Sequence, residues 1–203
     1  MTGSGTGPLL AVKYSAPPPR AGTVARHRLL ERLEAASGTR LCVVVAPAGW
    51  GKTTLLSHWV ARQPVSRRVA WVSLDGADDE PGRFWTYVLT ALHSATGIGR
   101  AALTAVSVPG VDAVGVGLPL LLEELASTPG EHVLILDDYH AVHDRRIHEG
   151  VEFLLAYLRP SLRLVLSGRA DPPLLVPAHR VGHRGRPHRP SVHRPHPGHD
   201  RRP

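Results

Sequence analysis

The stretch Leu41-Cys-Val-Val-Val-Ala46-Pro-Ala-Gly-Trp-Gly51-Lys52-Thr53-Thr54 decides the fold of this chain. Residues 41–46 are apolar and rich in valine, a pattern that predicts a buried parallel strand. The residues that follow are similar to the phosphate-binding loop G-x-x-x-x-G-K-[ST], with Ala46 in place of the first glycine. A strand that runs into such a loop and then into a helix predicts a P-loop nucleotide-binding domain.

The loop meets the physical requirements of a phosphate site. Gly49 and Gly51 let the backbone wrap an anion with its N–H groups, and the helix expected from about Lys52 points its positive end at the same anion. Lys52 would bridge the β- and γ-phosphates of ATP, and the Thr53 hydroxyl would hold Mg²⁺. We therefore predict ATP and Mg²⁺ as ligands, with a nucleotide-binding set of Ala48, Gly49, Trp50, Gly51, Lys52, Thr53 and Thr54.

A second apolar strand, predicted over residues 132–136, leads into two adjacent carboxylates. Asp137 fits the role of holding Mg²⁺, usually through water, and Asp138 that of polarising the attacking water. Alone the pattern is common in solvated turns, so both assignments depend on the P-loop upstream. Arg169 follows a strand predicted over residues 162–167, where a cation could contact the γ-phosphate as a catalytic residue. An ordinary exposed loop arginine is the alternative.

Strands and helices alternate along the rest of the chain. This pattern predicts an α/β fold, a parallel sheet flanked by helices with right-handed crossovers. Ligands of such sheets bind at the carboxyl ends of the strands, where the motif residues fall. A further strand is expected over residues 69–74, a loop over residues 97–117, and helices over 26–36, 52–62, from about 78, 118–126 and 147–158.

Composition indicates the compartment and the partners. The net charge of the 203 residues is +7, but the domain itself is nearly neutral because seven arginines and a single acid lie in residues 174–203. The one cysteine, Cys42, excludes a disulfide framework and fits a reducing cytoplasm. No stretch resembles a signal peptide or approaches the ~18 apolar residues of a membrane span. We expect a cytoplasmic protein with no membrane partner.

Three segments are expected along the chain. Residues 1–19 form an extended Gly/Pro-rich lead-in, and residues 20–174 the P-loop domain. Residues 175–203 are rich in Arg, His and Pro and predict a disordered tail. We interpret this tail as a shifted reading frame or a truncated remnant of a longer gene, with a genuine basic tail as the alternative. Reading the coding DNA past codon 175 in the other two frames distinguishes them.

Four ordered motifs together resemble one family. Besides the P-loop, they are Trp71-Val-Ser-Leu-Asp75 with Asp78-Asp79 and Phe84-Trp85, Asp137-Asp138-Tyr139-His140, and Leu164-Val-Leu-Ser167-Gly-Arg169 before Asp171-Pro-Pro-Leu174. Over residues 17–174 the chain resembles the P-loop (AAA-like, STAND-class) domain of the MalT-like transcriptional regulators of the LuxR family.

The resemblance implies an ATP-loaded switch that self-associates on binding an inducer. In that family DNA is bound only through a C-terminal helix-turn-helix, which has no counterpart in these residues. The resemblance also implies a sheet order of 1-4-3-2 with the fifth strand, normally beside the first, missing, so that the domain is incomplete. The entry Pro19-Arg20 with Val24-Ala-Arg26 resembles the segment that packs against the adenine in this family, which places Arg26 at the adenine.

Three functions stay open on the sequence. The first is a regulatory ATP-binding switch with slow hydrolysis, in which any ATPase activity would be weak. The second is a free-standing P-loop ATPase or kinase with its own acceptor. The third is non-specific, salt-dependent binding of nucleic acid through the basic tail. We favour the first, because neither residues 97–117 nor the tail offers convergent polar residues for an acceptor. Turnover measured with and without acceptors separates it from the second.

Overall fold

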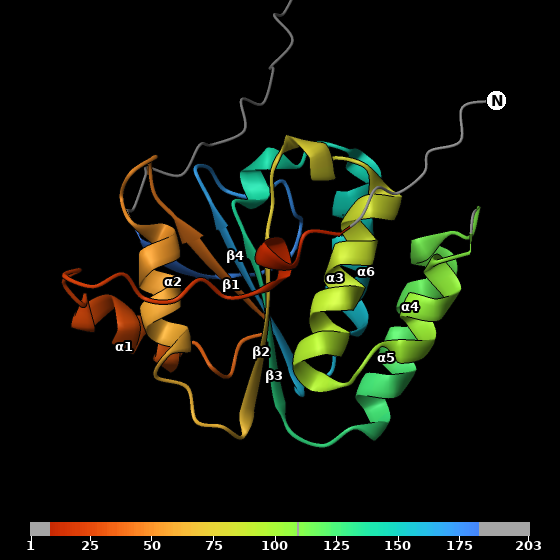
Figure 1. The fold of residues 1–203 in the computed structure, drawn as a ribbon, viewed down its shortest axis with the longest axis horizontal. Helices are drawn as coiled ribbons and strands as arrows, with labels where there is room; N and C mark the ends of the chain where they lie inside the picture. The colour runs from red at the N-terminus through yellow and green to blue at the C-terminus, as the bar shows by residue number, and fades with distance from the viewer. Residues whose placement is uncertain (1–8, 109, 183–203) are drawn as a thin grey trace, which may run out of the picture.

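Five parallel strands form a single sheet in the order β2-β3-β4-β1-β5 (Figure 1). The computed structural model describes residues 9–108 and 110–182 of the chain. The strands are β1 (Leu41–Val45), β2 (Arg67–Ser73), β3 (Glu131–Asp137), β4 (Leu162–Gly168) and β5 (His179–Gly182). The helices are α1 (His27–Ala35), α2 (Lys52–Val60), α3 (Pro81–Thr96), α4 (Arg100–Val106), α5 (Leu118–Ser127) and α6 (Arg145–Tyr157).

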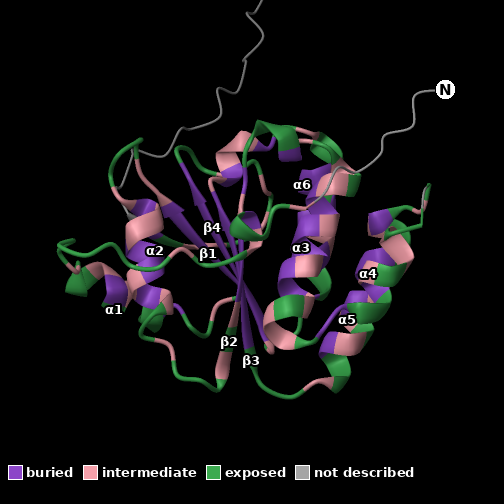
Figure 2. Cartoon of the chain, viewed as in Figure 1, coloured by how far each residue is buried: buried purple, intermediate pink, exposed green. Residues whose placement is uncertain are grey.

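The sheet separates two layers of helices. Alternate side chains of a strand point to opposite faces, so Leu41 and Val43 of β1 join one apolar cluster while Cys42 and Val44 join the other. The first cluster includes Phe84, Trp85 and further apolar residues of α3 to α6, and the second packs α1 and α2 through Leu33, Leu56 and Trp59. Figure 2 shows the buried strands running between these layers. The α/β fold predicted from the sequence is confirmed.

The edge of the sheet differs from the prediction. The order of the first four strands agrees with 1-4-3-2, but a fifth strand is present, and it pairs in parallel with β1 from Cys42↔His179 to Val45↔Gly182. It lies inside the segment expected to be a disordered tail. A four-residue strand with one buried apolar side chain, Val181, carries too little periodicity to be recognised in a sequence. Residues 183–203, and with them most of the predicted tail, lie outside the described residues.

The prediction of a loop over residues 97–117 is wrong for most of this segment. It contains α4 and a π-helical turn, η3 (Ala113–Gly117). The first backbone N–H groups of α4 are capped by the Glu124 carboxylate of α5, which accepts from Gly99, Arg100 and Ala101. The cap therefore comes from a residue more than twenty positions downstream. The glycines that predicted a loop instead form the turn before α4, where Gly97 and Gly99 have positive φ.

The lead-in is more ordered than an extended segment. Its described residues include a short 3₁₀ turn, η1 (Ala11–Tyr14), in which Lys13 is buried. Two more such turns follow strands at the carboxyl edge of the sheet: η2 (Gly76–Asp78) after β2 and η4 (Tyr139–Ala141) after β3. Within the described part of the chain, no helix is long and apolar enough to cross a bilayer.

Gly150 gives a first test of the packing. A Cβ at this position of α6 would lie 2.7 Å from Cζ2 of Trp85 and 2.9 Å from Cγ2 of Val114. We expect Gly150→Ala to destabilise the fold by about 1–3 kcal/mol through overpacking, although alanine is the better helix former. Urea unfolding measures the change. Gly38→Ala is the control, because its Cβ would meet nothing within 4 Å; equal stability of the two variants would contradict this packing.

Candidate functional site

The P-loop lies between β1 and α2, at the carboxyl edge of the sheet. Gly49 and Gly51 have φ values of +77° and +73°, a left-handed conformation that residues with a Cβ seldom adopt. Gly51 is the N-cap of α2, so the first backbone N–H groups of that helix face the loop. The two glycines thus turn the chain from strand to helix around a concave space, as the sequence predicted.

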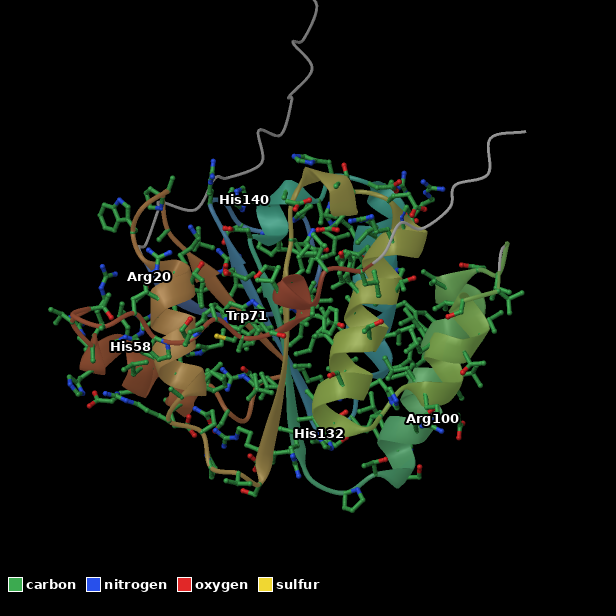
Figure 3. All side chains as sticks on the ribbon, viewed as in Figure 1. Arg20, His58, Trp71, Arg100, His132 and His140 are labelled. Carbon is green, nitrogen blue, oxygen red and sulfur yellow. The ribbon has the colours of Figure 1, made fainter. Side chains whose placement is uncertain are left out.

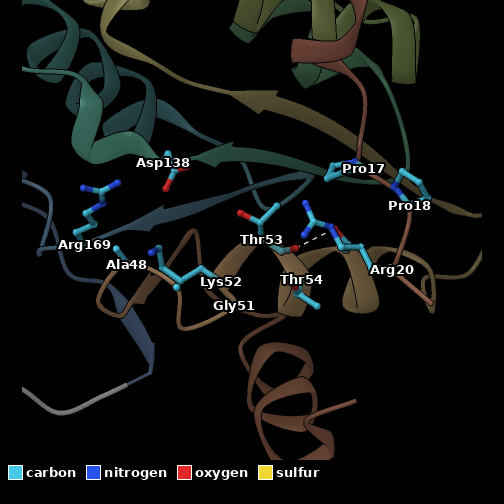
Figure 4. A pocket seen from close by; sticks show the side chains of 12 residues that line it. Pro17, Pro18, Arg20, Ala48, Gly51, Lys52, Thr53, Thr54, Asp138 and Arg169 are labelled. Carbon is cyan, nitrogen blue, oxygen red and sulfur yellow. Dashed lines mark hydrogen bonds between the residues drawn. The ribbon is translucent and has the colours of Figure 1, made fainter. Parts of the chain in front are cut away.

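That space is a cavity of about 360 Å³ (Figure 4). Asp138 and Arg169, which follow β3 and β4, line it together with the P-loop after β1. The carboxyl ends of three neighbouring strands therefore meet at one site. The full lining is Pro17, Pro18, Arg20, Ala48, Gly49, Gly51, Lys52, Thr53, Thr54, Ser57, Asp138 and Arg169.

Lys52 is held inside this cavity by the loop itself. Its Nζ donates to the carbonyl oxygens of Ala46 at 3.1 Å and Pro47 at 3.4 Å, and the side chain is buried. Among the described residues no carboxylate forms an ion pair with it. A buried ammonium without an acidic partner costs solvation free energy that an anion in the cavity would recover.

Asp137 lies at the base of the site in a hydroxyl network. The Thr53 hydroxyl donates to Asp137 Oδ2 at 2.7 Å, and the Ser167 hydroxyl donates to Oδ1. Burial raises the pKa of the Asp137 carboxyl, while the hydrogen bonds from Ser167 and Thr53 act in the opposite direction. The two side chains predicted to serve Mg²⁺ are therefore in direct contact, although their sequence positions are 84 residues apart.

The donor set fits Mg²⁺ only together with a phosphate. Thr53 and Asp137 supply oxygen atoms, which this hard cation prefers. No cluster of three or more His, Cys, Asp or Glu side chains suited to a metal occurs in residues 9–108 and 110–182. Since Mg²⁺ needs six oxygens at near-octahedral geometry, the others would come from phosphate and water. The residues thus fit a nucleotide-bound cation rather than an independent metal centre.

Asp138 adopts a conformation that is rare for its residue type. Its φ is +58°, the only positive value at a non-glycine position in the described chain. This turn directs the carboxylate towards the cavity, where 46% of the side chain is exposed and Oδ1 lies 3.6 Å from Nδ1 of His140. The Asp138 N–H donates to the Ser167 hydroxyl at 3.1 Å. Left-handed residues of this kind cluster at functional sites, where the surrounding contacts hold them.

A smaller adjoining cavity of about 240 Å³ lies between α2 and the segment before α1. Arg26, predicted to contact adenine, lines this cavity, and its guanidinium donates to the carbonyl of Trp50 at 2.8 Å. The Trp50 side chain is half-exposed and is not among the residues that line either cavity. Gly51 and Thr54 are common to both cavities.

Four residues of the main cavity and one beneath it were not predicted as site residues. Ser167 belongs to the motif Leu164–Arg169, but the sequence does not mark it as a site residue. Its role becomes visible only in the structure, where β4 pairs with β3 and the Ser167 hydroxyl donates to Asp137. The others, which line the cavity, are Pro17, Pro18, Arg20 and Ser57. Pro17 and Pro18 belong to the segment interpreted as a lead-in, and Arg20 begins the predicted P-loop domain. The resemblance at Pro19-Arg20 was the signal that could have found them. Figure 3 shows Arg20 on the same side of the sheet as α2.

Comparison with known proteins identifies relatives in one group of regulators. The chain is 37% identical over 175 residues to the HTH-type transcriptional regulator MalT of Cronobacter sakazakii, covering 85% of this chain and 19% of that protein. It is 36% identical over 174 residues to MalT of Yersinia enterocolitica, with the same two coverages. The chain thus spans about a fifth of the length of these curated relatives. No protein-family model matches it.

Solved structures show the same fold at lower identity. The Walker-type ATPase of Pyrococcus abyssi superposes with a TM-score of 0.53 at 18% identity, over 82% of this chain and 55% of that one. Cdc6p of Pyrobaculum aerophilum superposes with a TM-score of 0.54 at 17% identity, over 82% of this chain and 48% of that one. At this identity the likeness shows the fold alone, an α/β P-loop architecture with a parallel sheet flanked by helices.

Proposed function

We propose that this chain, a homologue of the MalT-type transcriptional regulators over 85% of its length, binds ATP with Mg²⁺ and hydrolyses it slowly as a regulatory switch. One observation carries the proposal. The buried Lys52 ammonium, without a carboxylate partner among the described residues, faces a cavity formed by a glycine-turned loop and a helix N-terminus. Both the charge and the N–H groups suit a polyphosphate.

The residues predicted from the sequence each have a definite task in this proposal. Lys52 and the loop N–H groups hold the phosphates, while Thr53 and Asp137 orient Mg²⁺, which when bound neutralises phosphate charge. Asp138 would accept a hydrogen bond from the attacking water, and Arg169, which also lines the cavity, would contact the γ-phosphate. Arg26 and its neighbours in the adjoining cavity would receive the adenine.

The regulatory part of the proposal comes from the relatives. Their name describes helix-turn-helix transcriptional regulators, and the present chain corresponds to about a fifth of their length. We propose a cytoplasmic switch that self-associates when loaded with ATP, with DNA contacts made by a helix-turn-helix elsewhere in such a regulator. A kinase would need a second substrate, which the name of the relatives does not indicate. The alternative of nucleic-acid binding through the tail concerns residues 175–203. Arg180 of this tail forms an ion pair with Asp171, and residues 183–203 lie outside the described part of the chain.

The role of Asp138 is tested by Asp138→Asn. This change keeps the size of the side chain and removes the charge that would polarise water, so we expect ATP binding to persist and turnover to fall at least tenfold. Asparagine also tolerates the left-handed conformation of this residue. Single-turnover hydrolysis of ATP by wild type and variant measures the effect. Turnover equal to the wild type would remove Asp138 from the proposed mechanism.

A further inference from the structure

Residues 9–26, called the strap below, pass beside the edge strand β2 and form part of the cavity wall. In Figure 1 this segment runs from beside α3, over the sheet, to α1 and α2. Pro17, Pro18 and Arg20 line the phosphate cavity. Thr23, Val24 and Arg26 line the adjoining one. The strap therefore covers both halves of the proposed nucleotide site.

The far end of the strap is attached to the P-loop and its helix. The Thr23 hydroxyl hydrogen-bonds with Nε2 of His58 on α2 at 2.8 Å, and Arg26 donates to the Trp50 carbonyl at 2.8 Å. Thr23 and His58 are exposed or half-exposed, so these contacts compete with water. This end alone would hold the strap weakly.

The near end is fixed by an ion-pair cluster in which Lys13 and Asp78 are buried and Asp75 is exposed. Lys13 Nζ binds the Asp78 carboxylate, which is 0% exposed, and Asp75 Oδ2 at 2.9 Å. The same ammonium lies 5.1 Å from the ring centre of Tyr87, whose hydroxyl accepts a hydrogen bond from the Leu10 N–H at 3.1 Å. Burial opposes the charge of Lys13, but the hydrogen bonds to Asp78 and Asp75 outweigh it and raise the pKa of Lys13.

We propose that Lys13 is a positioning residue for the nucleotide, acting through the strap. Only three residues separate Lys13 from Pro17, and the proline rings of Pro17 and Pro18 restrict φ, so a fixed Lys13 limits where the cavity wall can lie. Without this attachment the wall residues would have to be ordered at the moment of binding, at a cost in conformational entropy. The inference rests on the proposed ATP binding and adds a determinant of affinity outside the cavity.

Lys13→Met is the direct test, because methionine keeps the length of the aliphatic chain and removes the charge. Asp78 retains Arg83 Nε at 3.2 Å and the Asp75 N–H at 2.9 Å, so its carboxylate stays paired. We expect the Kd for ATP with Mg²⁺ to rise about tenfold, equivalent to ~1.4 kcal/mol. Amides of residues 9–23 should exchange hydrogen faster in the ligand-free variant, whereas those of α2 should not.

A milder variant covers the case in which Lys13→Met fails to fold. Asp75→Asn removes one charge from Lys13, but its amide oxygen can still accept from the Ala77 N–H and so keep the cap of η2. We expect a two- to threefold rise in Kd. Arg145→Met is the matched control, since it breaks an exposed ion pair with Glu149 on α6 and should leave the Kd unchanged.

The outcomes separate this inference from the proposed function. A wild-type chain that does not bind ATP would overturn the function, and with it the role of the strap. A wild-type chain that binds ATP, with folded Lys13→Met or Asp75→Asn binding it equally well, would overturn the inference alone. A lower melting temperature with an unchanged Kd would show that Lys13 serves stability only and would also overturn it.

Discussion

Lys52→Ala is expected to abolish the stabilisation of this fold by ATP. At a ligand concentration of a hundred times Kd, binding stabilises the wild type by about 2.7 kcal/mol. For a domain of this size that corresponds to a rise in melting temperature of roughly 5–10 °C. The substitution removes the cation that faces the cavity and also its hydrogen bonds to the carbonyls of Ala46 and Pro47. The melting temperature of the variant should therefore not respond to ATP with Mg²⁺.

Thermal unfolding with increasing ATP measures this difference. Arg62→Ala is the control, because Arg62 is an exposed cation just beyond the other end of α2, far along the helix from the P-loop. It should show the full shift of the wild type. Equal shifts for Lys52→Ala and Arg62→Ala would show that ATP does not bind at the P-loop.

Asp137→Asn is expected to separate stability from function. The Asp137 carboxylate is 3% exposed, and the described residues give it hydroxyl donors but no cationic partner. An amide of the same shape avoids burying that charge, so the ligand-free variant should be more stable than the wild type, by about 0.5–2 kcal/mol. The hydroxyls of Thr53 and Ser167 can rotate to satisfy the amide.

The same variant should lose the contribution of Mg²⁺ to nucleotide binding. In the wild type we expect Mg²⁺ to lower the Kd for ATP at least tenfold, and in Asp137→Asn the Kd should be nearly the same with Mg²⁺ and with EDTA. Calorimetric titration under both conditions measures this. Glu123→Gln, a charge change at an exposed position of α5, should leave both the stability and the Mg²⁺ dependence unaltered. A retained Mg²⁺ dependence in Asp137→Asn would exclude Asp137 from the cation site.

The parts of this structure that the sequence predicted are those with strong local patterns. Residues 41–54 combine a buried strand, two glycines with positive φ and a helix start within fourteen positions, and the structure shows each of them. The carboxyl ends of parallel strands meet at one edge of a sheet, so the approach of Asp138 and Arg169 to the P-loop followed from strand order alone. Their catalytic roles stay predictions.

What the sequence did not predict depends on contacts between distant residues. The cap of α4 comes from Glu124, the partner of the short strand β5 is β1, and the burial of Lys13 requires Asp78. In each case the local sequence predicts a different structure, namely a glycine-rich loop, a polar tail and an extended leader. Tertiary contacts override such local preferences, and they leave no periodic pattern in the segment itself.

The position of β1 between β4 and β5 also bears on how the chain is made. Its register partners, Leu164 in β4 and His179 in β5, are both more than a hundred residues downstream. During synthesis the apolar segment Leu41–Val45 therefore has no strand to pair with until most of the described domain has left the ribosome. Such non-local pairing slows folding and leaves the nascent strand open to aggregation. We therefore expect the nascent chain to depend on chaperones, and ATP to bind only after the last strand has joined the sheet.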